Sequence, residues 1–134
     1  MTVNKFKSNL NIVFSCKYHV VWCTKYRRKI LDGTTQLDLK NIIVNVCADR
    51  DCEIAALETT ENHVHLLVEV DPQYGIHRLI KEIKGKSSHT LRRKYKYLRT
   101  RVPSLWTNSY FVSTVGGAPL EKIKEYVENQ KRSR

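Results

Sequence analysis

Two histidines separated by a single residue, His63 and His65, are the first residues in this sequence whose spacing suggests chemistry. The surrounding segment HVHLLVEV is dominated by β-branched and aliphatic residues, which predicts a strand from His63 to Val70. Side chains two positions apart on a strand point to the same face, so the two imidazoles can hold one metal ion. An exposed sheet face that carries two histidines without any ligand explains an isolated pair of this kind equally well.

Tyr126 and Gln130 form a second pair near the end of the chain. They are four residues apart, so on a helix they share one face. Gln130 offers a neutral oxygen as a third metal ligand, and Tyr126 offers a phenol one turn away. If that helix docks over the sheet, it delivers both groups to the histidines. The ordinary interpretation of such a tyrosine is packing at the helix edge, beside Ile123 and Val127.

A tyrosine beside a metal ion suits the cutting and rejoining of a phosphodiester. A free phenol has a pKa of about 10, so it is mostly neutral at pH 7 and needs help to attack. A metal ion on the scissile phosphate withdraws charge and orients the bond. The phenolate leaves more readily than a sugar hydroxyl, so a 3′-OH can reverse the attack, whereas water would cut irreversibly.

The four cysteines allow one alternative metal site. Cys47 and Cys52 could join the histidines in a structural zinc site, although their C-x4-C spacing is loose and Cys47 falls on the apolar stripe of a predicted helix. We expect four reduced thiols in a cytoplasmic protein instead, since the N-terminus carries no export signal. No apolar run reaches about 18 residues, so no membrane partner is expected.

The charge of the chain favours a polyanionic partner. Lysine and arginine number 24 against 13 acidic residues, which gives a formal net charge of +11 and an isoelectric point near 9.7. Ten basic residues and one acid, Glu82, lie between Arg78 and Arg101. Although a solvated surface is the ordinary explanation of a charge run, so uneven a segment favours nucleic acid. The candidate DNA contacts are Lys25, Arg27, Arg28, Lys84, Lys86, Arg92 and Arg93.

The remaining patterns predict the elements that must position these residues. Thr34 or Thr35 is the expected cap of the first helix, and Gly85 interrupts the apolar stripe of the second. In chain order we expect a strand over 18–24, a helix over 35–50, strands over 53–59 and 63–70, a helix from Ile76 to Leu91, a strand over 109–115, and a helix over about 119–131 after a Gly116–Gly117 hinge.

This β-α-β-β-α-β order is the ferredoxin-like pattern, an α+β fold. It predicts one domain over residues 1–134, with a four-stranded antiparallel sheet, two helices on one face and an additional C-terminal helix. RNA-recognition modules share the order, so the fold alone does not decide the function.

The sequence resembles a known family, the TnpA-type single-tyrosine HUH transposases of bacterial and archaeal insertion sequences. The resemblance spans nearly the whole chain and rests on five blocks in the family's order: YHVVWCTKYRR (18–28), NHVHLLV (62–68), IKGKSS (83–88), LW with SY (105–110) and EYVENQ (125–130).

The resemblance implies a role for each group. His63, His65 and Gln130 would hold Mg²⁺ or Mn²⁺, and Tyr126 would be the nucleophile that takes a 5′-phosphate and leaves a free 3′-OH. It implies recognition of hairpins near the element's ends and transfer of the element as single-stranded DNA. It also implies a homodimer that joins its sheets through the fourth strand and shares its active sites between subunits.

Three other functions suit parts of the same sequence. A non-catalytic RNA- or DNA-binding module fits the fold order and the charge, and it does not require Tyr126 and the histidines to converge. A metal nuclease that uses water would tolerate the loss of Tyr126. Domesticated relatives of the family bind repeated genomic palindromes, but they are usually longer than this chain.

Overall fold

The four long strands form one antiparallel sheet in the order β4-β5-β3-β6. The structure is a computed structural model that describes residues 7–8, 12–115 and 120–130. The strands are β3 (Lys17–Cys23), β4 (Glu53–Thr59), β5 (His63–Glu69) and β6 (Phe111–Thr114). This strand order confirms the predicted ferredoxin-like architecture, and it leaves β4 and β6 at the edges.

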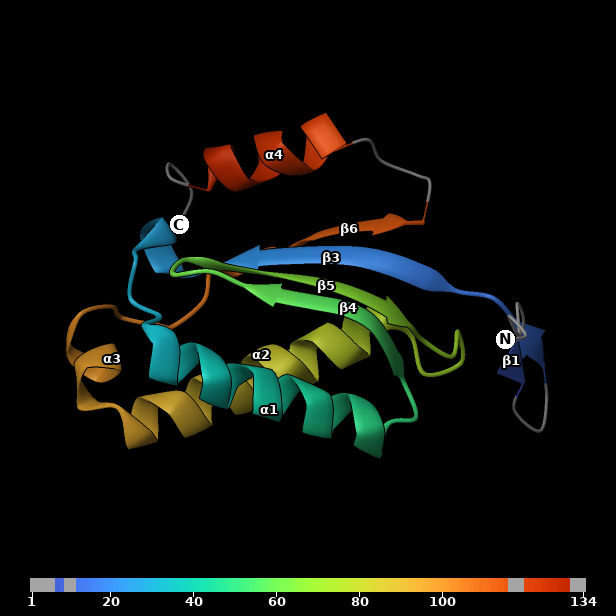
Figure 1. The fold of residues 1–134 in the computed structure, drawn as a ribbon, viewed down its shortest axis with the longest axis horizontal. Coiled ribbons are helices and arrows are strands. Elements are labelled where there is room, and N and C mark those ends of the chain that lie inside the picture. Colours follow the sequence, from blue (N-terminus) through green and yellow to red (C-terminus); the bar gives the residue numbers. More distant parts are fainter. Residues whose placement is uncertain (1–6, 9–11, 116–119, 131–134) are drawn as a thin grey trace.

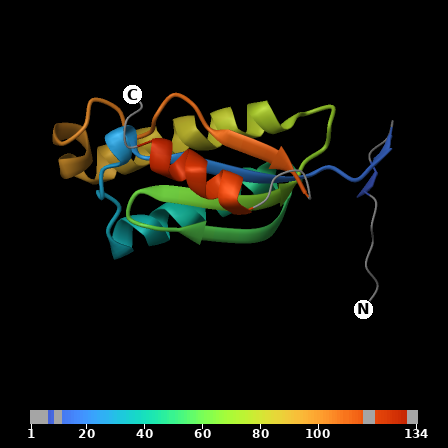
Figure 2. The ribbon, with the colours of Figure 1, turned by 90° about the horizontal axis from the view of Figure 1, so that it is seen from above.

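The helices cover the sheet on both faces (Figure 1). Helices α1 (Gly33–Asp49) and α2 (Ile76–Lys94) lie side by side on one face, and the short α3 (Lys96–Thr100) follows α2. Helix α4 (Leu120–Asn129) lies on the opposite face, and Figure 2 shows it crossing over β3. Within the described residues, no helix is long and apolar enough to cross a membrane.

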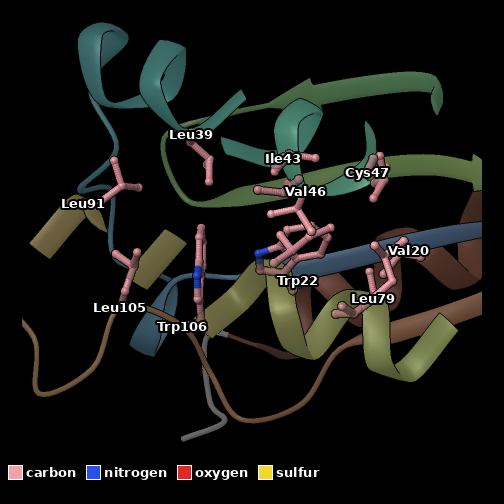
Figure 3. Close-up of a cluster of buried hydrophobic side chains, with 14 of the residues drawn as sticks. Val20, Trp22, Leu39, Ile43, Val46, Cys47, Leu79, Leu91, Leu105 and Trp106 are labelled. Atoms are coloured by element: carbon pink, nitrogen blue, oxygen red, sulfur yellow. The ribbon is translucent and has the colours of Figure 1, made fainter. Parts of the chain in front are cut away.

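The core lies between the sheet and the pair α1 and α2 (Figure 3). Alternate residues of the central strands enter it, and one apolar stripe of each helix packs on them. Its two tryptophans, Trp22 and Trp106, meet edge to face at 6.0 Å between ring centroids, and the Trp106 indole N–H donates to Ser87 Oγ at 3.0 Å. Its other members include Val20, Leu39, Ile43, Val64, Leu66, Leu79, Ile80 and Ile83.

Several local predictions need correction. The N-cap of α1 is Asp32, not Thr34 or Thr35: its carboxylate accepts the Thr35 N–H at 2.9 Å, so the helix begins at Gly33. Gly85 does not break the helix itself, since α2 runs unbroken from Ile76 to Lys94, and the polar Ser87 is the buried residue between Ile83 and Leu91. A bulge between Ile54 and Ala56 interrupts the alternation of side chains that a regular strand over 53–59 would have.

Other elements differ in extent from the prediction. The fourth strand is shorter than the expected 109–115, and both α3 and a small hairpin of β1 (Lys7–Ser8) and β2 (Val13–Phe14) were not expected. These are short, marginal elements with weak sequence patterns, so propensity does not identify them. The expected Gly116–Gly117 hinge and the start of the last helix at Pro119 lie outside the described residues.

Candidate active site

The face of the sheet that α4 covers carries both histidines of the H-x-H motif. In β5, Val64 and Leu66 are fully buried against α1 and α2, as the alternation predicts. His63 and His65 therefore lie on the other face. There they stand opposite Cys23 and Val21 of the neighbouring strand β3. Both histidines are half-buried.

The His63 ring is oriented by two neighbours from the turn before β5. Its Nδ1 lies 2.8 Å from Asn62 Oδ1 and 2.9 Å from Thr60 Oγ1. Since a carbonyl-type oxygen only accepts, these partners assign the proton to Nδ1 and leave the Nε2 lone pair free. Burial lowers the pKa of His63, and the positive charge of Arg27 lowers it further. The neutral imidazole with a free Nε2 is the form that binds a metal ion.

His65 has a third histidine beside it that sequence spacing did not identify. Nδ1 of His19, on β3, lies 3.3 Å from Nε2 of His65, and the ring centroids are 5.5 Å apart. Burial lowers the pKa of His65, and His19 contributes in the same direction. His19 was not predicted because 46 residues separate it from His65, and only the pairing of β3 with β5 brings the two rings together.

Tyr126 lies on this same sheet face. Its ring packs on Phe111 with 5.5 Å between centroids, and its hydroxyl lies 3.5 Å from Ser109 Oγ. Phe111, Val21 and His65 stand opposite one another in adjacent strands, so Phe111 and His65 are roughly 10 Å apart across the sheet. Burial raises the pKa of Tyr126 to about 12. The phenol is therefore protonated at neutral pH and needs activation.

Gln130 lies just beyond the last turn of α4, and its side chain points into the protein. It is among the buried polar residues, with only 5% of its surface exposed. No described residue donates a hydrogen bond to Oε1. A buried amide oxygen without a partner is costly, so such groups are usually satisfied by a ligand or ion. The chemistry of this oxygen fits a metal ligand that works together with two imidazoles.

The alternative zinc site is not supported. Cys47 belongs to the core on the opposite side of the sheet from the histidines, and Cys52 Sγ lies 3.6 Å from the Arg50 carbonyl. Among the described residues, no three histidine, cysteine or acidic side chains lie close enough to hold a metal ion. Burial also raises the pKa of the Cys47 thiol to about 12, which opposes the thiolate that zinc requires.

The predicted DNA contacts divide into two groups. Three of them are engaged within the protein: the Lys84 ammonium donates to the carbonyls of Thr107, Asn108 and Ser109, and Arg27 and Arg92 also donate to main-chain carbonyls. In the second group, Lys86, Arg28 and Arg93 are exposed, with Lys86 paired to Glu82 at 3.4 Å, and the half-buried Lys25 lies over the Tyr26 ring.

Two tyrosines that lie among basic residues, Tyr95 and Tyr97, have structural roles. Tyr95 donates to Asp38 Oδ2 at 2.5 Å, and Tyr97 donates to the Ile30 carbonyl at 2.9 Å. Both rings pack against the core. They tie α3 and the end of α2 to α1, so their position among basic residues does not indicate a stacking platform for bases.

Comparison with known proteins places this arrangement in a family. The family model described as "Transposase IS200 like" matches residues 12–130. The chain is 32% identical over 128 residues to the ISDra2 transposase TnpA of Deinococcus radiodurans, covering 94% of this chain and 91% of that protein. It is 30% identical over 126 residues to the transposase for insertion sequence element IS200 of Salmonella typhimurium, covering 92% and 82%.

Solved structures show the same similarity. A crystal structure of a Deinococcus radiodurans R1 protein described as a transposase superposes with a TM-score of 0.81 at 31% identity, covering 92% of this chain and 97% of that chain. A REP-associated tyrosine transposase bound to a REP hairpin superposes with a TM-score of 0.60 at 16% identity, covering 91% and 68%. At that identity the second structure supports the fold alone.

Proposed function

Because this chain belongs to the IS200-like transposase family, we propose that it cuts and rejoins single-stranded DNA at the ends of an insertion sequence. The proposed reaction passes through a covalent bond between Tyr126 and a 5′-phosphate. One observation carries the proposal: α4 lies on the sheet face that bears His63 and His65, and its Tyr126 packs on Phe111 of that face.

In the proposed cleavage step, the Tyr126 oxygen attacks the scissile phosphorus. The O–P bond to tyrosine forms, the bond from phosphorus to the 3′-oxygen breaks, the phenol loses its proton, and the departing oxygen gains one as a 3′-OH. Rejoining is the reverse, with a 3′-OH attacking the phosphotyrosine and the phenol leaving. The Phe111 ring and the Ser109 hydroxyl hold the phenol on the sheet during both steps.

The residues present fit a divalent cation. His63 keeps Nε2 free, His65 lies on the same strand face, and the Gln130 oxygen is buried without a described donor. These three residues would hold Mg²⁺ or Mn²⁺, with the choice between the two resting on the family resemblance, because imidazole and amide ligands do not by themselves select Mg²⁺. A cation bound there would withdraw charge from the phosphate and orient the scissile bond.

The proposed substrate is single-stranded DNA that carries hairpins near the element's ends. The net charge of +11 supports a polyanionic partner. The proposed assembly is a homodimer joined through β6, whose outer edge is unpaired among the described residues. In this structure α4 lies over its own chain's sheet, and the sharing of active sites between subunits stays a prediction.

Trapping of the covalent intermediate tests the function. Hairpin-bearing single-stranded oligonucleotides from the DNA flanking the coding sequence would be incubated with the protein and Mn²⁺, then resolved under denaturing conditions. We expect a protein–DNA adduct from the wild-type chain and from Tyr74→Phe, a matched tyrosine whose hydroxyl bonds Glu82. We expect none from Tyr126→Phe, which should still bind the hairpin, and none in EDTA.

Other outcomes would point to other functions. An adduct formed by Tyr126→Phe would contradict the assigned nucleophile. Cleaved ends without attached protein would indicate a metal nuclease that uses water. Hairpin binding unaffected by metal, without any adduct from the wild-type chain, would indicate a binding module or a palindrome-binding relative.

A further inference from the structure

Arg27 connects the turn after β3 to the last turn of α4. The turn η1 (Lys25–Arg27) follows β3 directly, and Arg27 reaches from it across 100 residues of sequence. Its Nη1 donates to the Val127 carbonyl at 3.1 Å and lies 3.5 Å from Glu128 Oε2. The Arg27 side chain is only 12% exposed, whereas that of Glu128 is 69% exposed. The contact to the main chain is thus the protected one.

The backbone of η1 has an unusual conformation at the residue that makes this contact. Tyr26 and Arg27 have φ values of 57° and 52°, a region that residues with a Cβ atom rarely adopt. Such conformations persist where the surrounding structure enforces them, and they concentrate at functional sites. Here the Arg27 N–H donates to the Thr24 carbonyl at 2.8 Å, and Thr24 Oγ1 donates to the Arg28 carbonyl at 2.6 Å. The result is an exposed Tyr26 and an inward-pointing Arg27.

We propose that Arg27 is a positioning residue that locks the last turn of α4 onto the histidine face of the sheet. Val127 follows Tyr126 directly, and its carbonyl also accepts the N–H of Gln130 at 3.3 Å. A bond to this carbonyl therefore restrains the turn that carries both the phenol and the amide oxygen. The contact between Arg27 and α4 does not depend on the reaction. Its importance for catalysis rests on the proposed function.

The chemistry of the contact favours arginine. The last carbonyls of a helix lack intrahelical partners and carry partial negative charge, so a buried cation stabilises them. A guanidinium presents several donors in a rigid fork, and Arg27 uses one of them for the carbonyl while approaching the Glu128 carboxylate. Its Nε is buried with no described acceptor, a desolvation cost that the contacts to α4 must offset. Arg27, a candidate DNA contact from the sequence, is thus better explained as a residue that makes contacts within the protein.

Hydrogen exchange of the metal-free protein tests the locking directly. In Arg27→Gln we expect the Gln130 amide and its neighbours in the last turn of α4 to exchange about tenfold faster or more, because a charged hydrogen bond is lost. Arg28→Gln makes the same change of charge one residue away at an exposed position, and it should leave α4 exchange unchanged. Unchanged protection of the Val20 and Leu66 amides would show that the sheet stays folded.

Two further variants separate the parts of the contact. Glu128→Gln removes only the exposed ion pair and should change exchange little, whereas Arg27→Lys keeps the charge and should restore part of the protection. Equal exchange of α4 in wild type and Arg27→Gln, or an equal increase in Arg28→Gln, would overturn the proposal.

The consequence for function is read from Mn²⁺ affinity and adduct formation. We expect Arg27→Gln to weaken Mn²⁺ binding and slow adduct formation by about tenfold or more, while hairpin affinity falls no more than in Arg28→Gln. A larger loss of hairpin affinity with normal adduct formation would return Arg27 to the DNA contacts. If the wild-type chain forms no adduct, the proposed function fails, while the exchange experiment still decides whether Arg27 locks α4.

Discussion

His63 shows how much of the proposed metal site depends on residues outside the proposed ligand set. The side chains of Asn62 and Thr60 both contact its Nδ1, and they decide which nitrogen keeps a free lone pair. The same Thr60 hydroxyl accepts the N–H groups of Asn62 and His63, so the turn before β5 and the imidazole are held by one hydrogen-bond cluster. Partners of this kind typically tune the affinity of a metal site as well as its geometry.

Asn62→Ala should therefore weaken metal binding without removing a ligand. The His63 ring loses an acceptor that selects its tautomer, and we expect Mn²⁺ affinity to fall by about 10–100-fold. Titration of Mn²⁺ followed by paramagnetic resonance measures the effect. The control is Asn45→Ala, an exposed asparagine on α1, and equal affinities in the two variants would contradict the assigned role.

The environment of Tyr126 predicts a pH dependence. Its pKa is raised to about 12, so below that value each added pH unit increases the phenolate fraction tenfold. If attack limits the rate, single-turnover adduct formation at saturating Mg²⁺ should rise steadily from neutral to mildly alkaline pH, with a logarithmic slope approaching one. A rate independent of pH over this window would show that deprotonation of the phenol does not limit the reaction.

At the scale of elements, two contacts organise the histidine face. Lys84 of α2 donates to three consecutive carbonyls before β6, and the last belongs to Ser109, whose hydroxyl faces Tyr126. Burial lowers the pKa of Lys84 to about 8, so at neutral pH it still carries the three N–H donors that three acceptors require. Arg27 makes the corresponding connection to α4.

The free edge of β6 gives a test of the proposed dimer. The Val115 N–H donates to Lys17 of β3, so by alternation the N–H of Val112 points to the outer edge. Val112→Pro removes that donor and leaves the internal ladder intact, and proline is tolerated on edge strands. We expect a folded chain that sediments as a monomer at concentrations where the wild type is a dimer. A dimer that persists in Val112→Pro would place the interface elsewhere.

At the scale of the whole molecule, a high net charge does not mean that every cation is available to DNA. Arg92 and Arg93 are neighbours in sequence, yet they differ in structure. The Arg92 guanidinium donates to the Pro103 and Val102 carbonyls, whereas Arg93 is exposed. Counterion release depends on cations that reach phosphates, so the two residues should contribute differently to binding.

The salt dependence of hairpin binding should separate this pair. Arg93→Gln should reduce the slope of log affinity against log salt by about 0.7–0.9, the value of one phosphate interaction. Arg92→Gln should change the slope little and instead lower the thermal midpoint, since two carbonyls lose their donor. Fluorescence anisotropy at several salt concentrations measures the slopes. An equally large decrease of the slope in Arg92→Gln would reverse the assignment.

Sequence alone determined the features that depend on local periodicity. The alternation of His63 and His65 with Val64 and Leu66 predicted which face each occupies, because side chains on a strand alternate regardless of context. The strand and helix order likewise predicted the fold that the structure confirms. The spacing of Tyr126 and Gln130 predicted one shared helix, but α4 ends at Asn129, so only Tyr126 belongs to the helix and Gln130 follows it.

The tertiary structure decided what depends on contacts between distant segments. His19 beside His65, Arg27 beneath α4, and Lys84 below the loop before β6 are separated from their partners by 46, 100 and up to 25 residues. A basic or imidazole side chain looks the same in sequence whether it meets solvent, DNA or a buried carbonyl. Only the packing of β3, α2 and α4 in the folded chain determines which of these partners each side chain receives.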